Sequence, residues 1–172
     1  RNGEKMILTE EKLERKKRKY YPQDLEITGW DILEKEAKEL LDHSVISKDD
    51  LVTFLEKWSE LLCILSEETA RRFIRMTCHT DQEEYTKAYN EFNAKVMEPF
   101  QPYTFRLEKK YYESPYRKDL PEQRYSELDR TFSNHMELYR EENVPLQTKE
   151  EQLSSEHHAI RSKMSVKYNG EE

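Results

Sequence analysis

Glycine is almost absent from this sequence, and its distribution limits the folds that the chain can adopt. The three glycines are Gly3, Gly29 and Gly170, so that no glycine lies between residues 29 and 170. Sheets with tight hairpins usually need glycine where the turn requires a positive φ. The glycine-free stretch is rich instead in glutamate, lysine and leucine, which are good helix formers. We therefore expect this part of the chain to be helical.

Apolar residues recur every three or four positions along the stretch, which is the spacing of one helix face. Helices are expected at about 30–42, from an N-cap at Ser47 with a break at Ser66, and from Asp81 with a kink near 98–102, where two prolines remove backbone donors. Two more helices follow Pro121 and Pro145, because proline is tolerated in a first turn. The expected fold is an all-α, antiparallel bundle of about five to six helices.

The last eight residues have a different pattern. SVKY at 165–168 alternates between polar and apolar residues and ends at Asn169-Gly170, which is a hairpin-turn signal. We expect a short β-strand that starts a hairpin whose partner is absent, so that the chain would be a fragment of something longer. The predicted organisation is an N-terminal extension over 1–20, with a solvated helix at the basic run RKKRK (15–19), a helical domain over 21–164, and this strand over 165–172.

The charge balance and the hydropathy exclude some classes of partner. The 36 acidic residues outnumber the 29 basic ones, and the net charge is −7. A nucleic-acid partner needs a basic face, and no apolar run approaches the roughly 20 residues that span a bilayer, so neither nucleic acid nor membrane is expected. No signal peptide is visible, and Cys63 and Cys78 are too few for a disulfide framework, so free thiols and a cytoplasmic location are expected.

Glu156, His157 and His158 lie together in SSEHHAI (154–160), and all three are residue types that bind metal ions. Two ligands on one helix must lie three or four residues apart to share a face. The adjacent histidines point about 100° apart, and neither has a carboxylate, thiol or imidazole at those spacings. We therefore interpret both as structural, with His157 facing inward and His158 toward the flank. The inward stripe is Leu146, Leu153, His157, Ile160 and Met164.

A second candidate metal site lies in TCHTD (77–81). Cys78, His79 and Asp81 all have ligand chemistry, but Asp81 suits a helix cap with Glu84 three residues on. A metal site would need further ligands from elsewhere in the chain. The other histidines, His43 and His135, stand alone in the sequence. We interpret the group as a junction between two helices.

Two groups of side chains could bind an anion or a peptide. Arg71, Arg72 and Arg75 could bind a carboxylate or phosphate, but Glu67 and Glu68 lie one turn earlier, and local i,i+4 ion pairs are the simpler explanation. Tyrosines on the apolar stripes could line a groove for a peptide, although such residues more often form core and boundary. They are Tyr85, Tyr89, Tyr103, Tyr111 and Tyr112.

Several stretches resemble the N-terminal part of oligoendopeptidase F-type zinc metallopeptidases, which are relatives of thimet oligopeptidase. Their order and spacing fit that family over nearly all residues from about 20 onward. Among them are ITGWDILEKEAKELL (27–41), RMTCHTD (75–81), YYESPYRKDL (111–120) and the terminal YNGEE (168–172).

The resemblance implies a longer parent protein in which the N-terminal helices form one wall of a deep channel that admits short peptides. In that family the C-terminal part binds zinc through the two histidines of H-E-x-x-H and a downstream glutamate, while the motif's own glutamate polarises the attacking water. No residue of this chain matches that set, so no catalytic, cofactor-binding or metal-binding residue is assigned. We expect the chain to be inactive without the catalytic part and to self-associate through exposed apolar surface.

An alternative of a different class stays open. A stand-alone helical module without enzymatic activity would bind a partner helix through an exposed apolar stripe. Such a module and a peptidase domain would share the same helical pattern.

Overall fold

The computed structural model describes residues 17–138, 140–162 and 164, and all its regular elements in these ranges are helical. Three short elements connect the α-helices: η1 is a π-helical turn, and η2 and η3 are 3₁₀ helices. The order is α1 (Trp30–Asp42), α2 (Lys48–Cys78), α3 (Glu83–Phe92), η1 (Asn93–Met97), α4 (Glu98–Tyr112), η2 (Pro115–Asp119), α5 (Glu122–Leu138), η3 (Glu141–Asn143) and α6 (Val144–Ser162).

The predicted fold class requires a correction. The helical part of the prediction agrees with the structure, but the described residues contain no β-strand, and the strand is removed from the fold class. The residues assigned to that strand, 165–168, lie outside the described ranges. Alternation over four residues is a weak signal, because a strand needs a paired neighbour for its backbone groups, and the described part of the chain provides none.

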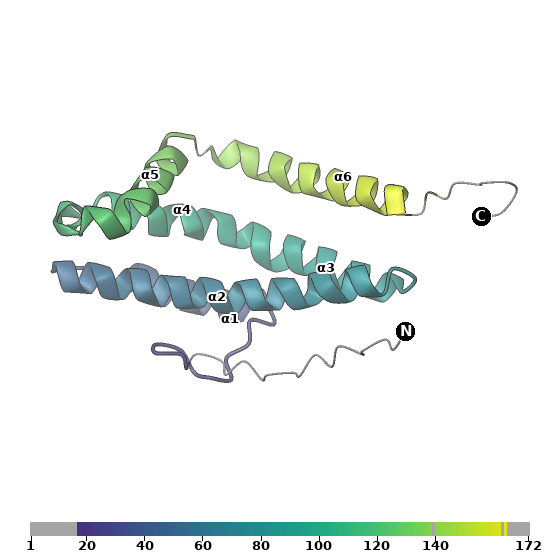
Figure 1. The fold of residues 1–172 in the computed structure, drawn as a ribbon, viewed down its shortest axis with the longest axis horizontal. Helices are drawn as coiled ribbons and strands as arrows, with labels where there is room; N and C mark the ends of the chain where they lie inside the picture. Colours follow the sequence, from purple (N-terminus) through teal and green to yellow (C-terminus); the bar gives the residue numbers. More distant parts are fainter. Residues whose placement is uncertain (1–16, 139, 163, 165–172) are drawn as a thin grey trace, which may run out of the picture.

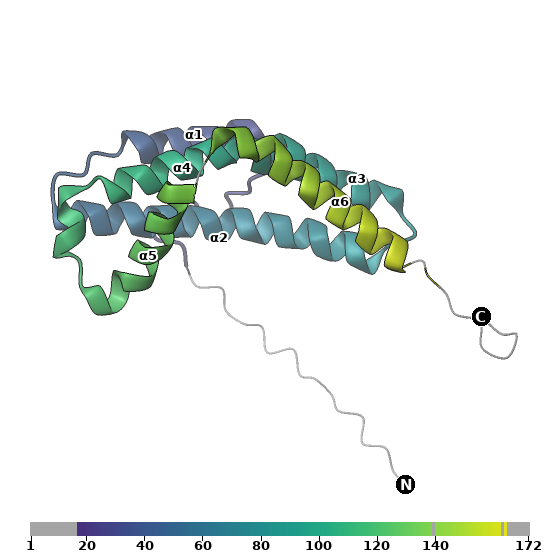
Figure 2. The same cartoon turned by 90° about the horizontal axis from the view of Figure 1, so that it is seen from above.

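The helices are arranged around a central pair of long elements. α2 runs antiparallel to the consecutive α3, η1 and α4 (Figure 1). α1 packs against one face of this pair, whereas α5 covers one end of the opposite face (Figure 2). α6 starts beside α4 and crosses the same face as α5, toward the far ends of α2 and α3 (Figure 1, Figure 2).

The core lies between α1, α2 and α4 and extends to α5 through aromatic rings. Phe54 of α2 is fully buried and packs against Trp58, with ring centroids 5.9 Å apart. Trp58 contacts Phe132 of α5 at 5.1 Å, and Phe132 contacts Tyr111 of α4 at 5.4 Å. Phe132 therefore joins α5 to both central helices.

The helix boundaries agree with the sequence in some places and differ in others. α1 spans 30–42 as predicted, and Ser47 caps α2 by accepting the backbone N–H of Asp50 at 3.1 Å. The break at Ser66 is wrong, because α2 continues for 31 residues. The cap at Asp81 is also wrong, because α3 begins at Glu83 without a side-chain cap. After Ser66 the acidic residues form ion pairs along the continuous helix, and Asp81 is exposed.

The irregularity between α3 and α4 starts earlier than predicted. The π-helical turn η1 covers 93–97, and the N–H of Glu98 donates to the carbonyl of Asn93. Pro99 follows in the first turn of α4, and Pro102 lies inside that helix. Both the π-helical turn and the prolines interrupt the α-helical hydrogen bonds, so the irregular segment runs from 93 to 102 rather than from 98 to 102.

The segment before α1 is attached to α2 by carboxylates. The Glu60 carboxylate accepts the backbone N–H groups of Lys19, Tyr20 and Tyr21, each at 3.0 Å. Glu56 accepts the Tyr20 hydroxyl at 2.6 Å. Residues 17–19 are not helical, so the helix expected at RKKRK is wrong for them, while 15 and 16 and the rest of 1–16 lie outside the described residues.

Replacing Phe132 by alanine tests its role in attaching α5. The ring is 8 % exposed, and we expect Phe132→Ala to lower the free energy of unfolding by about 3–5 kcal/mol, the usual loss for a buried phenylalanine. Urea unfolding measures the change. Phe73→Ala is the control, because that ring is 47 % exposed and its truncation should change stability by about 1 kcal/mol or less. Equal losses in the two variants would contradict the packing described above.

Candidate functional site

The two histidines of SSEHHAI lie exposed on α6. Their rings are 5.8 Å apart, and the expectation that His157 faces inward is wrong. The apolar residues of the predicted stripe are also uncovered, because no described element packs on that side of α6. Their exposed fractions are 65 % for Leu146, 55 % for Leu153, 66 % for Ile160 and 74 % for Met164.

The TCHTD residues form a turn between α2 and α3. Cys78 ends α2, and the N–H of His79 donates to the carbonyl of Arg75 at 3.1 Å. The His79 ring lies 5.2 Å from that of Tyr85. Cys63 and Cys78 are free thiols, as predicted, and both are exposed. Throughout the described ranges, no three His, Cys, Asp or Glu side chains are grouped so that they could hold a metal ion.

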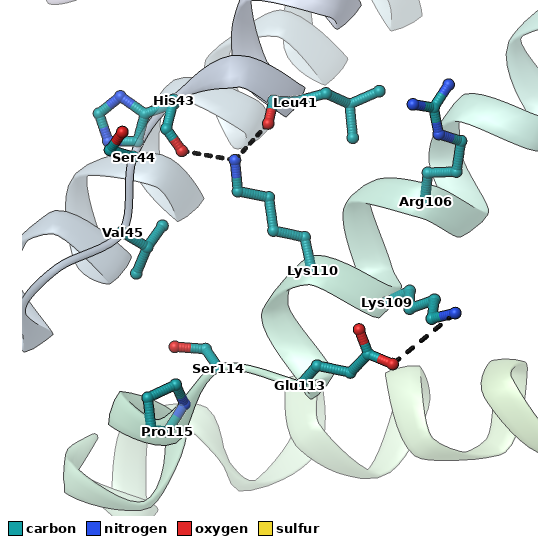
Figure 3. Close-up of a pocket in the computed structure, with 10 residues that line it drawn as sticks. All are labelled: Leu41, His43, Ser44, Val45, Arg106, Lys109, Lys110, Glu113, Ser114 and Pro115. Atoms are coloured by element: carbon teal, nitrogen blue, oxygen red, sulfur yellow. Dashed lines mark hydrogen bonds and ion pairs between the residues drawn. The ribbon is translucent and has the colours of Figure 1, made fainter.

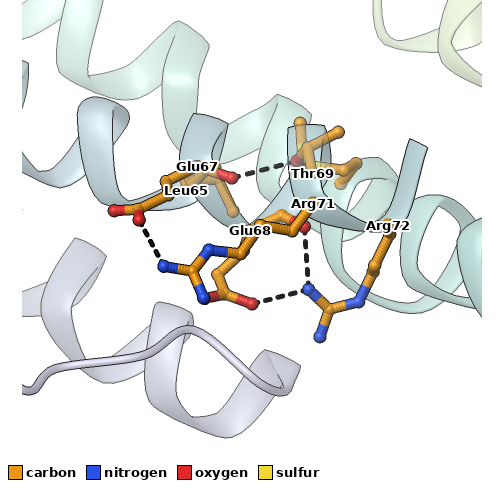
Figure 4. A network of polar contacts seen from close by, with 7 residues as sticks. Leu65, Glu67, Glu68, Thr69, Arg71 and Arg72 are labelled. Carbon is orange, nitrogen blue, oxygen red and sulfur yellow. Dashed lines mark hydrogen bonds and ion pairs between the residues drawn. The ribbon is translucent and has the colours of Figure 1, made fainter. Parts of the chain in front are cut away.

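Arg71 and Arg72 are engaged along their own helix α2 (Figure 4). Arg71 pairs with Glu67 at 2.5 Å and Arg72 pairs with Glu68 at 2.7 Å, which confirms the local i,i+4 ion pairs. The Arg72 guanidinium also lies 4.0 Å from the centroid of the Phe92 ring. Arg75, the third arginine of the candidate anion site, is exposed.

The tyrosines divide among several environments. Tyr111 is 1 % exposed and donates to Asp129 at 3.2 Å, while Tyr103 donates to Glu34 at 2.9 Å. Core and boundary roles are therefore confirmed for these two residues. Tyr89 instead lines a hollow between helices, as described below.

One hollow, of about 590 Å³, lies where the ends of α1 and α4 meet (Figure 3). Lys110 reaches across it and donates to the carbonyls of Leu40 at 3.2 Å, Leu41 at 2.5 Å and His43 at 2.5 Å. Burial lowers the pKa of the Lys110 ammonium, and the charge of Asp42 opposes that shift. All three ammonium protons serve the carbonyls at the end of α1, so we interpret this hollow as a joint between helices.

A buried carboxylate holds α5 against α4. Glu108 is 5 % exposed, and its Oε1 lies 2.9 Å from Nδ1 of His135. Burial raises the pKa of the Glu108 carboxyl, while the hydrogen bond and charge of His135 oppose the shift. One turn away, Arg117 pairs with Asp129 through two nitrogens. Asp129, Phe132 and His135 therefore share the face of α5 that contacts the bundle.

A second hollow lies between α2 and the α3, η1 and α4 segment, and we call it the α2–α4 groove. Its volume is about 460 Å³, and none of its lining residues is charged, although 38 % of the chain is charged. The polar lining residues are Ser66, Thr69, Gln101 and Thr104. The apolar ones are Leu62, Leu65, Ala70, Phe73, Tyr89, Met97 and Phe100.

The α2–α4 groove continues the surface on which α5 packs. Steps of four residues along α2 lead from Trp58, which contacts α5, to Leu62 and then Ser66, which line the groove. α6 crosses this same face (Figure 1, Figure 2). Leu62 is 36 % and Phe73 47 % exposed, and the rings of Phe73 and Tyr89 meet at 5.7 Å across the groove. The groove is thus a concave apolar surface that the described helices leave open.

Among the residues that line this groove, the sequence indicates only Tyr89, as one of the tyrosines that could line a peptide groove. It assigns no such role to Phe73, because periodicity does not reveal which part of a stripe a neighbour covers. The available signal was the uncharged series Leu62, Ser66 and Ala70, spaced by four in a chain rich in charge. Such a series predicts a helix face that avoids open solvent.

The Glu108 carboxyl should make stability depend on pH. A carboxyl whose pKa is raised on folding stabilises the fold at low pH, and this contribution is lost as pH rises from the unfolded value through the folded value. Glu108→Gln removes the titration, so we expect its free energy of unfolding to gain on the wild type between about pH 4 and pH 8. Urea unfolding at both pH values measures the difference. Glu113→Gln is the control, because Glu113 is an exposed carboxylate at the end of α4. An effect of Glu108→Gln that does not change with pH would contradict the prediction.

Comparison with known protein families identifies the chain's family. The family model described as the Peptidase M3 N-terminal domain matches residues 22–139. The match covers well over half of the chain and includes α1 through α5. Neither a curated protein nor a solved structure matches the chain. Within the described residues, no helix combines the length and the apolar character needed to cross a membrane.

Proposed function

This chain belongs to the family of M3 peptidase N-terminal domains, and we propose that it is the non-catalytic N-terminal portion of a zinc-dependent oligopeptidase of the oligoendopeptidase F type. The observation that carries the proposal is the family match over residues 22–139, which includes the whole core and both walls of the α2–α4 groove. The parent would hydrolyse short peptides, and its location would be cytoplasmic.

Zinc would be held by the catalytic part of the parent and not by this chain. The described side chains do not fit the ion, because His157 and His158 are exposed neighbours on α6 and no described acidic residue or cysteine completes a set with them. We therefore derive no catalytic step from these residues. The proposed contribution of this chain is the shape of one channel wall, which would exclude folded proteins and admit short peptides.

The uncovered stripe on α6 is the proposed contact with the catalytic part. Leu146, Leu153 and Ile160 are spaced by seven residues, so they lie on one side of the helix, and each is more than half exposed. Apolar side chains in such a row indicate a surface that packs against another element. The same stripe also suits the second candidate function, a stand-alone module that binds a partner helix.

Peptide hydrolysis separates the two candidates. The purified 172-residue chain, supplied with zinc, should not cleave a quenched fluorescent peptide, whereas the parent polypeptide should cleave it and lose activity with a chelator. Chelator-sensitive cleavage by the chain alone would show that it contains a catalytic site after all. The reading frame beyond Glu172 gives an independent answer, because a frame that ends without an H-E-x-x-H motif would favour the module.

The α6 stripe also makes a prediction about association. We expect the isolated chain to self-associate as its concentration rises, because the stripe has no partner among the described helices. Light scattering measures the mass, and Leu153→Asp should shift the chain toward monomer by placing a charge in the stripe. Ile46→Asp is the matched control, since Ile46 is 76 % exposed before α2 and lies far from α6 in sequence. A monomer at all concentrations would contradict the prediction.

A further inference from the structure

We propose that the α2–α4 groove binds one large apolar side chain of an extended peptide. If the chain is part of a peptidase, as proposed above, the groove would give that enzyme a preference for an apolar residue at one position of its substrate. The binding itself does not depend on the proposed function, but the consequence for substrate preference does.

The composition of the groove is the first argument. All of its lining residues are uncharged in a chain of which 38 % of residues are charged, and depletion of charge is typical of the centre of a binding surface. Leu62 and Phe73 remain partly exposed there, although burial of aromatic and aliphatic side chains is energetically favourable. A volume of about 460 Å³ suits one large side chain with its adjoining backbone.

The polar groups of the groove are the second argument. The Thr69 and Thr104 hydroxyls donate to the carbonyls of their own helices, at 3.0 Å and 3.3 Å. Ser66 of α2 and Gln101 of α4 are exposed, and neither side chain makes a hydrogen bond to another residue that the structure describes. A hydroxyl and an amide on opposite walls can therefore donate to, and accept from, the backbone of a peptide that lies between them.

The position of α6 is the third argument, and it selects the occupant. α6 contacts α4 and crosses the face that contains the groove (Figure 1, Figure 2), which leaves less room there for a folded domain or a second copy of the chain than for one extended strand. An extended peptide has only the width of one strand. The absence of charge in the lining also argues against a charged side chain as the occupant, because its desolvation would not be compensated.

Binding to the 172-residue chain tests the inference without any need for hydrolysis. Two blocked octapeptides that differ only by Phe or Ser at a central position are titrated, and amide NMR shifts locate the site. We expect the Phe peptide to bind at least about tenfold more tightly, with shifts along 62–73 and 97–104. Equal affinity of the two peptides, or shifts elsewhere, would overturn the inference.

Two matched variants of α2 complete the test. Ala70→Glu places a charge in the groove and should weaken binding of the Phe peptide by about tenfold or more, since the carboxylate would have to be desolvated. Ile74→Glu is the control, because Ile74 is 57 % exposed on the same helix but does not line the groove. Both positions are exposed, and equal melting temperatures verify that both variants fold. Equal binding by the two variants would overturn the inference.

The parent enzyme separates this inference from the proposed function. In the parent, Ala70→Glu should raise KM for a Phe-containing peptide and leave kcat unchanged, while Ile74→Glu should change neither. If the parent cleaves peptides and both variants behave alike, the groove inference fails and the proposed function stands. If the parent cleaves no peptide but the chain binds the Phe peptide, the groove inference stands and the proposed function fails. A groove already filled by α6, or by a second copy of the chain, in the absence of peptide would also overturn the inference.

Discussion

Burial of the apolar side of α2 is the constraint on which the rest of the structure depends. From Leu51 to Leu65 the buried residues of this helix recur every three or four positions and form one broad apolar stripe, which several neighbouring helices share in covering. α1 packs against α2, Lys110 of α4 lies over the Phe54 ring, and Phe132 of α5 contacts Trp58. Beyond Leu65 α2 lies beside α3 and shares the groove lining with η1 and the start of α4, and Phe73 and Ile74 are exposed. The open groove thus lies along the part of α2 that follows its contact with α5.

The contact that places α5 combines a buried aromatic ring with two polar pairs that contribute differently to the stability of the fold. Phe132 provides burial, whereas Glu108 pays a desolvation penalty that His135 only partly offsets. The Arg117 and Asp129 pair is half-exposed and therefore contributes less than its close geometry suggests. Because α6 follows α5 in the chain, the position of α6 over the groove depends on this contact.

The helical class could be predicted from the sequence because it depends on local signals. The missing glycines and the spacing of apolar residues are properties of neighbouring positions, and α1 and the cap at Ser47 were located from them. The errors at Ser66 and Asp81 have a common cause, since an acidic residue after a polar one marks a cap only where the chain actually leaves the helix. At Glu67 and Glu68 ion pairs with Arg71 and Arg72 support a continuous helix instead.

The surface of the fold could not be predicted from the same signals. Periodicity gives the stripe that contains His157 the same appearance as a buried one. Whether a stripe is covered depends on the lengths and directions of other helices, which are long-range properties. For the same reason the groove was missed, although its uncharged series was present in the sequence.

A surface without catalytic groups can still influence a reaction, but only in certain ways. None of the residues that line the groove carries a charge at neutral pH, so the groove cannot stabilise a developing charge by ion pairing. Its effect would come from contacts that the substrate makes equally in the ground state and the transition state, and such contacts change the apparent affinity for substrate and not the chemical step. If the groove acts as proposed, this chain would set the apparent affinity for a peptide, and a separate catalytic part would set the rate of the chemical step. Peptide preference would then change through the groove without a change in the chemical step.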